Sequence, residues 1–248
     1  MTPTRPTPPP HWGIDLRELD RLAAALTAID PVAARRLTAL RPMLERDHAV
    51  LTFGGHFKSG KSTAVNAALA RPLLPTDDLP ETGVPCHIRA GARDAAVVIS
   101  AADRTGAQIA RAIACTTDAI RGEVALMTAA GERRHAALSH GVDRVEVTVG
   151  TNHVPPRACW VDAPGINDTD EMNACARRAA AAGDVLAWVL TTRQLIADTE
   201  VKFLSAHVET HGPASLQFIV NAFLADDTDE AWRRFAADKL PGDRKSVV

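Results

Sequence analysis

The sequence lacks the cysteine spacing of a disulfide framework, a zinc site or a redox motif. Its four cysteines, Cys86, Cys115, Cys159 and Cys175, stand far apart, whereas such sites use close pairs. Isolated cysteines of this kind are typical of reduced thiols in a cytoplasmic protein. We therefore expect a cytoplasmic location.

The sequence also lacks an excess of charge of either sign. The 28 basic and 30 acidic residues leave a formal net charge of -2, and the isoelectric point is near 6.5. A protein that attracts nucleic acid or an anionic membrane by bulk charge carries an excess of Lys and Arg. Nucleic acid is therefore not expected as a partner.

Long hydrophobic runs are also missing. No window approaches the roughly 20 apolar residues of a membrane span, and the first residues, M-T-P-T-R-P-T-P-P-P, lack the apolar centre of a signal peptide. We expect residues 1–14 to form a disordered, Pro-rich tail. No nucleophile with histidine and acid partners stands at a recognisable spacing either.

What is present begins with two helical patterns. From Asp15 to Arg46 leucines recur at helical spacing, and Asp30 followed by Pro31 separates two helices as an N-cap and a first helical residue. Residues 15–47 are thus a helical addition before the first strand. Their apolar stripes need a partner, and two alternatives stay open: the rest of this chain, or bundle helices that lie elsewhere.

The next segment predicts a phosphate-binding loop. Residues 54–63 read G-G-H-F-K-S-G-K-S-T between an apolar run and a helical segment, which is the context that the motif requires. Backbone N–H groups and the helix N-terminus face the phosphates. Lys61 carries charge to the outer phosphates, and the hydroxyl of Ser62 suits Mg²⁺. The candidate residues are Gly55, His56, Phe57, Lys58, Ser59, Gly60, Lys61, Ser62 and Thr63.

Two later segments complete the predicted site. In the proline-rich loop 71–85, Thr82 stands where nucleotide switches place a threonine that completes the Mg²⁺ shell. A short apolar strand then runs into D-A-P-G, which can also form a simple turn. We expect Asp162 to bind Mg²⁺ directly or through water, and the amide of Gly165 to reach a γ-phosphate. The metal candidates are thus Ser62, Thr82 and Asp162.

The remaining pattern predicts the fold class. Strands are expected at 49–53, 86–89, 95–100, 145–149, 157–162, 184–190 and 216–220, and helices at 64–70, 108–128, 199–211 and 229–240. Trp160 and Trp188 should be core residues. The alternation predicts a three-layer α/β domain with a mostly parallel sheet over residues 48–248. Together with the phosphate loop, Thr82 and the D-A-P-G segment, it indicates a P-loop NTPase domain of GTPase type.

These motifs resemble a known family. F-K-S-G-K-S-T-A-V-N-A-A-L-A, L-P-E-T-G-V-P, V-D-A-P-G-I-N-D and T-E-V-K-F-L are similar to the GTPase domain of dynamin superfamily proteins, in particular bacterial dynamin-like proteins, over roughly Val50 to Leu224. The resemblance implies GTP hydrolysis with Mg²⁺ and dimerisation across the nucleotide. It also implies a helical neck and stalk that polymerise on membranes. The implied partners are GTP, a second copy or another dynamin-like chain, and a membrane reached through that partner.

One departure from the family pattern concerns the base. Asn221 matches the start of the guanine-reading motif, but Ala222 replaces its lysine and Leu224 its aspartate, with Asp226 and Asp227 further along. Losing a buried carboxylate costs discrimination of a few kcal/mol. ATP therefore stays an alternative to GTP.

A second departure is the ending, because no final strand and no stalk follow the helix predicted at 229–240. Either the chain is truncated, or its neck partners come from another chain. The altered base motif and this ending keep one alternative function open: a degenerate, non-hydrolysing scaffold that binds nucleotide and pairs with another dynamin-like protein.

Two further features carry alternatives. Some dynamin-like proteins have, in place of Lys58, a serine that helps to hold a catalytic monovalent cation. The lysine ammonium either occupies that cation's place or points to solvent. His207 and His211 stand four apart, as metal ligands can, but without a third ligand we expect two surface histidines.

Overall fold

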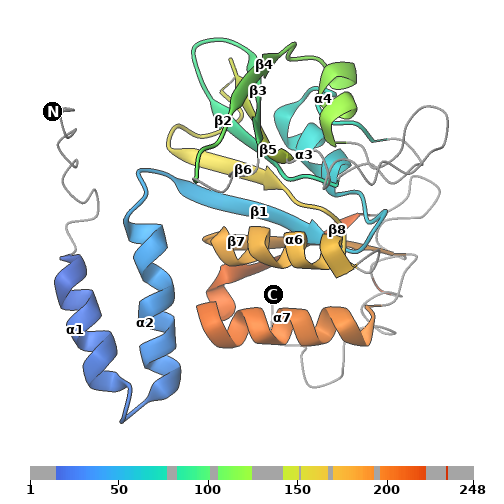
Figure 1. Ribbon diagram of the computed structural model, residues 1–248. Coiled ribbons are helices and arrows are strands. Elements are labelled where there is room, and N and C mark those ends of the chain that lie inside the picture. Colours follow the sequence, from blue (N-terminus) through green and yellow to red (C-terminus); the bar gives the residue numbers. More distant parts are fainter. Residues whose placement is uncertain are drawn as a thin grey trace, which may run out of the picture.

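The structure, a computed structural model, describes residues 15–76, 83–100, 106–124, 142–150, 152–166, 170–192, 196–221 and 233. Figure 1 shows its elements in order. They are α1 (Leu16–Leu26), α2 (Pro31–Leu44), β1 (Ala49–Gly55), α3 (Lys61–Leu69), β2 (Cys86–Ala90), β3 (Ala95–Ser100), β4 (Ala110–Ile113), α4 (Thr117–Val124), β5 (Val142–Val149), β6 (Ala158–Asp162), α6 (Asp170–Ala182), β7 (Val185–Thr191), α7 (Asp198–His211), the 3-10 turn η1 (Pro213–Ser215) and β8 (Leu216–Asn221).

The described strands form a sheet with the order β4-β3-β5-β2-β6-β1-β7-β8. Strand β1 pairs in parallel with β6 and β7, β2 with β5, and β7 with β8. Antiparallel pairs join β2 to β6, β3 to β5 and β3 to β4. Because β6, β1, β7 and β8 run in one direction, the segments that follow them start at the same edge of the sheet.

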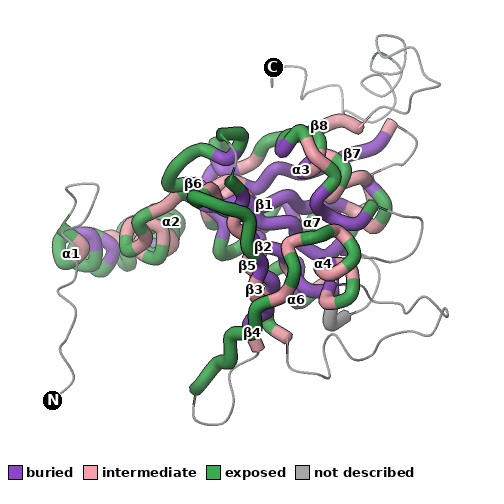
Figure 2. The backbone as a smooth tube through the Cα atoms, turned by 90° about the horizontal axis from the view of Figure 1, so that it is seen from above, coloured by how far each residue is buried: buried purple, intermediate pink, exposed green. Residues whose placement is uncertain are grey.

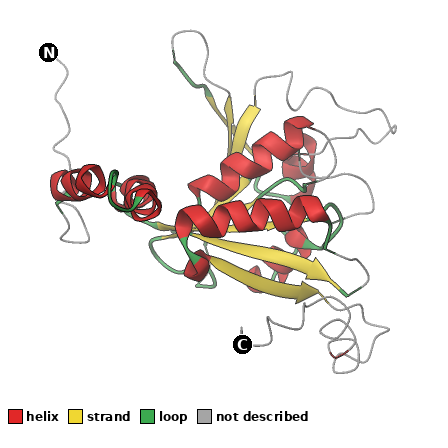
Figure 3. Cartoon of the chain, turned by 90° about the horizontal axis from the view of Figure 1, so that it is seen from below, coloured by secondary structure: helices red, strands yellow, loops and turns green. Residues whose placement is uncertain are grey.

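Helices cover both faces of this sheet (Figure 1, Figure 3). One core cluster joins the sheet to Val65 of α3 and Ile120 of α4, and another joins it to Ala180 of α6 and Leu204 of α7. The predicted three-layer α/β class is confirmed.

Strand β7 is buried on both faces, which accounts for its apolar sequence. Ala187 and Val189 belong to the cluster under α3 and α4, while Leu186, Trp188 and Leu190 belong to the cluster under α6 and α7. A strand that is buried on both faces reads as a continuous apolar run. Trp188 is 1% exposed, as expected for a core residue.

The N-terminal helices form a hairpin beside the domain (Figure 1). Both helices start at an aspartate cap: the side chain of Asp15 accepts from Arg17 N, and that of Asp30 accepts from Val32 N and Ala33 N. Helix α1 packs on α2, and Figure 2 shows much of the hairpin surface as exposed.

One of the two alternatives for the partner of the hairpin was the rest of this chain. The domain does contact the hairpin, through α2 and the residues that follow α2. Arg36 Nε donates to the carbonyl oxygen of Glu209 at 3.2 Å, and Arg46 pairs with Asp184 at 2.6 Å. Leu22 stays 48% exposed and Ile29 79% exposed. The hairpin's apolar stripes are therefore only partly covered within the described residues.

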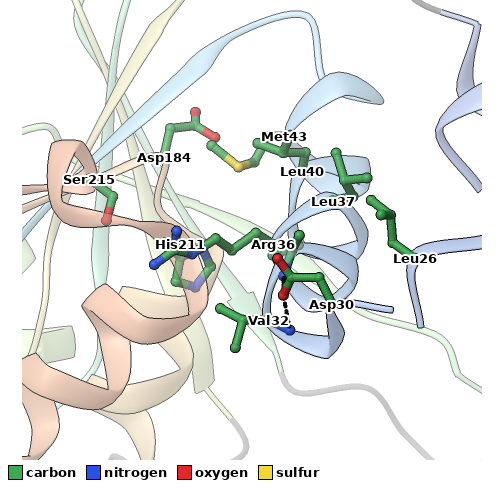
Figure 4. A pocket seen from close by; sticks show the side chains of 12 residues that line it. Leu26, Asp30, Val32, Arg36, Leu37, Leu40, Met43, Asp184, His211 and Ser215 are labelled. Atoms are coloured by element: carbon green, nitrogen blue, oxygen red, sulfur yellow. Dashed lines mark hydrogen bonds between the residues drawn. The ribbon is translucent and has the colours of Figure 1, made fainter. Parts of the chain in front are cut away.

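A cavity of about 390 Å³ lies in the seam between the hairpin and the domain. Figure 4 shows Leu37, Leu40 and Met43 of α2 on one side and His211 and Asp184 on the other. Asp184 directly precedes β7, so the cavity lies at the sheet edge opposite to the end of β1.

Three expectations need correction. Residues 108–128 are not one helix, because residues 110–113 pair with β3 as an edge strand and only Thr117–Val124 is helical. Helix α6 was not expected at all. His207 is 7% exposed rather than a surface residue: it stacks on His211 and contacts Ser215 Oγ at 3.1 Å. The helix predicted at 229–240 lies outside the described residues, apart from residue 233.

Within the described part of the chain, none of the helices is long and apolar enough to cross a membrane.

Candidate functional site

The loop between β1 and α3 has the backbone shape of a phosphate-binding loop. Gly60 has φ of 90°, and an added Cβ would lie 2.2 Å from Asn221 Nδ2. An added Cβ on Gly55 would lie 2.6 Å from the carbonyl oxygen of Val189. Only glycine fits these two positions, because the conformation and the close approach both exclude a side chain.

Lys61 folds back onto this loop. Its Nζ donates to the carbonyl oxygen of His56 at 2.9 Å and lies 3.5 Å from that of Gly55, and the residue is 7% exposed. Burial lowers the pKa of Lys61 to about 8, while the charges of Asp162 and Glu200 oppose that shift. The site thus holds a buried cation that a bound anion can stabilise.

Ser62 and Asp162 meet although they are 100 residues apart in the chain. Ser62 Oγ donates to Asp162 Oδ2 at 2.8 Å, and Asp162 is 1% exposed at the end of β6. The parallel pairing of β1 with β6 brings them together, since Phe53 lies opposite Asp162. A hydroxyl and a carboxylate are oxygen donors of the kind that Mg²⁺ prefers, so this pair fits the ion.

Gly165 lies against the phosphate loop. An added Cβ on it would lie 2.9 Å from Phe57 Cα and 3.2 Å from Lys61 Nζ. Phe57 N donates to the carbonyl oxygen of Ile166 at 3.3 Å, and His56 pairs with Ile166. The D-A-P-G segment is therefore held in register with the loop.

Asn221 contacts the loop from the other side. Its Nδ2 donates to the carbonyl oxygen of Ser59 at 3.1 Å, so in this structure the residue supports the loop. Sequence reasoning assigned Asn221 to the base and missed this contact, which no sequence signal predicts. The altered base-reading positions Ala222 and Leu224 lie outside the described residues, as does Thr82.

The other loop candidates differ in exposure. Ser59 is 1% exposed, and its Oγ has no hydrogen-bond partner among the described residues, so it can bond to a ligand. Lys58 is exposed with φ of 60°, and its Nζ lies 5.7 Å from the centroid of the Phe57 ring. His56 Nδ1 contacts the carbonyl oxygen of Phe57 at 2.8 Å, and Thr63 is exposed on α3.

Glu200 is a buried acid that sequence reasoning passed over. It is 2% exposed in the first turn of α7, where Oε2 accepts a hydrogen bond from Ala197 N at 2.9 Å. The only sequence signal is an acid in the first turn of a predicted helix, which is common.

Comparisons with known proteins agree with this geometry. A family model described as the Dynamin family matches residues 51–223. Dynamin-like protein A of Bacillus subtilis (strain 168) is 25% identical over 208 residues, which is 83% of this chain and 16% of that protein.

Two solved chains from work on an oligomerised bacterial dynamin pair also match. One has a TM-score of 0.51 and 12% identity and covers 93% of this chain and 40% of its own. The other has a TM-score of 0.47 and 15% identity, with coverages of 91% and 34%. That work is described as giving a mechanism for the long-range sensing and tethering of membranes. This chain thus spans less than half of the length of each relative.

Proposed function

Since the chain belongs to the dynamin family, we propose that it binds GTP with Mg²⁺ and hydrolyses it. The observation that carries this proposal is the contact of Ser62 with Asp162 beside the buried ammonium of Lys61. The loop between β1 and α3, the cation of Lys61 and the oxygen donors of Ser62 and Asp162 lie at one edge of the sheet. Phosphoryl transfer requires such groups close together.

The residues of the chain then divide the work. The amides of the loop and the N-terminus of α3 bind the phosphates. Lys61 exchanges its carbonyl acceptors for phosphate oxygens, which stabilise its charge. Ser62 and Asp162, with Thr82 as a third proposed ligand, would hold Mg²⁺, which would offset charge on the phosphates. The amide of Gly165 is positioned to donate to the terminal phosphate.

Steady-state phosphate release, measured with GTP and with ATP in the presence of Mg²⁺, tests the proposal. Lys61→Ala should abolish tight triphosphate binding, and Ser62→Ala should weaken Mg²⁺-dependent binding. Thr82→Ala should spare binding and slow turnover. Ser205→Ala is the control, because it removes an exposed hydroxyl from α7, outside the loop, and should leave both intact.

Phosphate release that Lys61→Ala does not change would contradict the proposed site. Unaltered hydrolysis by Thr82→Ala would remove only that residue from it. Isothermal titration with a non-hydrolysable triphosphate separates binding from turnover in each variant.

A second candidate function is a non-hydrolysing scaffold that binds nucleotide and pairs with another dynamin-like chain. Ala222 and Leu224 favour it, because they remove the lysine and the carboxylate of the guanine-reading motif. The phosphate-release assay decides, since a partner found by co-purification supports the scaffold only if release is absent.

The assembly is proposed at the same level. We propose that residues 15–47 are a neck-like segment and that the GTPase domain, assigned to residues 48–248, pairs across the nucleotide with a second copy or another dynamin-like chain. We also propose a cytoplasmic protein that reaches a membrane through its partner. A related structure is described as an oligomerised bacterial dynamin pair with a mechanism for sensing and tethering membranes, which supports the membrane part of this proposal. Analytical ultracentrifugation with and without a transition-state analogue tests the pairing.

A further inference from the structure

Glu200 lies on the side of α7 that faces the phosphate loop. The buried residues of this helix are Glu200, Leu204 and His207, so they share one face. Leu204 packs in the cluster that contains Ile166. Ile166 N in turn donates to the carbonyl oxygen of Gly55 at 3.2 Å. Glu200 is one helical turn from Leu204, in the direction of the helix N-terminus.

That direction leads to the phosphate edge of the sheet. The C-terminal residue of α7, His211, lines the seam cavity together with Asp184, which precedes β7 (Figure 4). The N-terminal turn of α7 therefore lies at the opposite edge, where β1 ends at Gly55 beside Val189. The carboxylate of Glu200 is therefore buried at the same edge of the sheet as the loop rather than in solvent.

Among the described residues, the charge of Glu200 has no direct counter-ion. Within the described residues it makes no ion pair, and its hydrogen-bond donor is Ala197 N. The N-terminus of α7 favours a negative charge at this place. Lys61 is the cation whose pKa the charge of Glu200 raises. In the nucleotide-free protein the two opposite charges therefore stabilise each other through the loop.

We propose that Glu200, through its charge, weakens the binding of nucleotide phosphates to the loop and speeds their release. The proposal rests on the nucleotide binding proposed above. Bound phosphates bring negative charge to Lys61, so they compete with Glu200 for the same cation and are repelled by the carboxylate. Because Glu200 is 2% exposed, water and salt screen this repulsion little.

The size of the effect follows from Coulomb's law. Two unit charges held about 10 Å apart at an effective dielectric constant of about 20 interact strongly enough to change an affinity roughly tenfold. The repulsion grows with the charge of the ligand, so it should be larger for a triphosphate than for a diphosphate and absent for a nucleoside.

The test removes the charge and keeps the shape. Glu200→Gln has an amide oxygen that can accept the hydrogen bond from Ala197 N. Asp198→Asn is the matched control, because it removes an exposed acid from the same helical turn. Dissociation constants and dissociation rates are measured with fluorescent GDP and a fluorescent non-hydrolysable GTP analogue, each with Mg²⁺, at low and high salt.

We expect Glu200→Gln to bind the diphosphate about 5-fold and the triphosphate about 10-fold more tightly, mainly through slower dissociation. The gain should persist at high salt, while Asp198→Asn should differ from wild type by less than about 2-fold. A purely structural role of Glu200 predicts weaker binding instead, with no dependence on phosphate number.

The proposal is overturned if Glu200→Gln binds the nucleotides as the wild type does, binds them more weakly, or changes the affinity for both by the same factor. In these cases the proposed nucleotide binding is not contradicted. Wild-type protein that binds neither nucleotide overturns the proposed function itself. Glu200→Met, which also removes the charge, is measured beside Glu200→Gln. If neither variant folds, the charge is required for the fold rather than for release, and the proposal is again wrong.

Discussion

Replacing Lys61 by methionine should stabilise the nucleotide-free protein and at the same time remove its nucleotide site. Burial lowers the pKa of Lys61 from 10.5 to about 8. At about 1.4 kcal/mol per unit, keeping the ammonium buried costs about 3 kcal/mol at pH 7. Methionine has a similar length and no charge. Carbonyl groups of Gly55 and His56 lose a donor, which costs about 1 kcal/mol each, so the net gain is about 1 kcal/mol.

The gain should depend on pH with a defined sign. Between the folded pKa of about 8 and the unfolded value of 10.5 the unfolded wild type binds more protons at Lys61, so wild-type stability rises with pH in that window. The difference from Lys61→Met is therefore largest below pH 8 and shrinks toward pH 10.5.

Urea unfolding followed by tryptophan fluorescence measures both effects, because Trp188 is buried next to Gly54 of β1. Lys202→Met is the control: it removes an exposed lysine from α7, outside the loop, and should change stability by less than about 1 kcal/mol. Added Mg²⁺ and GTP should stabilise the wild type and the control but not Lys61→Met. A Lys61→Met protein that is less stable than the wild type without nucleotide would refute the reasoning.

Three further predictions concern the base, the loop lysine and acid stability. With Leu224 in place of an aspartate, competition binding should show a weaker preference for GTP over ATP than the family norm; strong preference that survives Asp226→Ala and Asp227→Ala contradicts this. If Lys58 replaces a monovalent cation, hydrolysis needs no added potassium, and Lys58→Ser should acquire a potassium requirement at constant ionic strength. A strong potassium requirement in the wild type would contradict this role of Lys58. His207 is buried, which together with the neighbouring His211 lowers the pKa of its imidazole to about 4. The native state therefore binds fewer protons than the unfolded state below the unfolded pKa of 6.5, and stability should fall by about 2–3 kcal/mol as pH drops from 6.5 to 4. His207→Gln should lose that dependence, and equal pH slopes in urea melts of both proteins would contradict it.

Local signals predicted the elements that depend on neighbouring residues. Asp30 caps α2 through the N–H groups of Val32 and Ala33, and the apolar run of β7 is buried on both faces. The prediction of helix for residues 110–113 was wrong because an edge strand forms only where a partner strand is available. Here Val97 of β3 lies opposite Ala112. That pairing joins segments across a loop, so no local pattern announces it.

The prediction that His207 is a surface residue was wrong for a related reason. Spacing shows that His207 and His211 share a helix face, but not which face the domain covers. Leu204 on the same face packs under the sheet, and Ser215 after the helix contacts His207. Burial is a property of the packed layers rather than of the helix alone.

The sequence by itself determined the chemistry of each local motif: the glycines of the loop with Lys61 and Ser62 at the start of α3, and, separately, the aspartate that ends an apolar strand. Only the tertiary structure decided which distant groups meet there. Ser62 reaches Asp162, Asn221 reaches the carbonyl oxygen of Ser59, and α7 turns its N-terminal end toward the loop. The physical reason is the strand order β6-β1-β7-β8. Parallel strands gather their carboxyl ends at one edge, and that order depends on packing across the whole sheet.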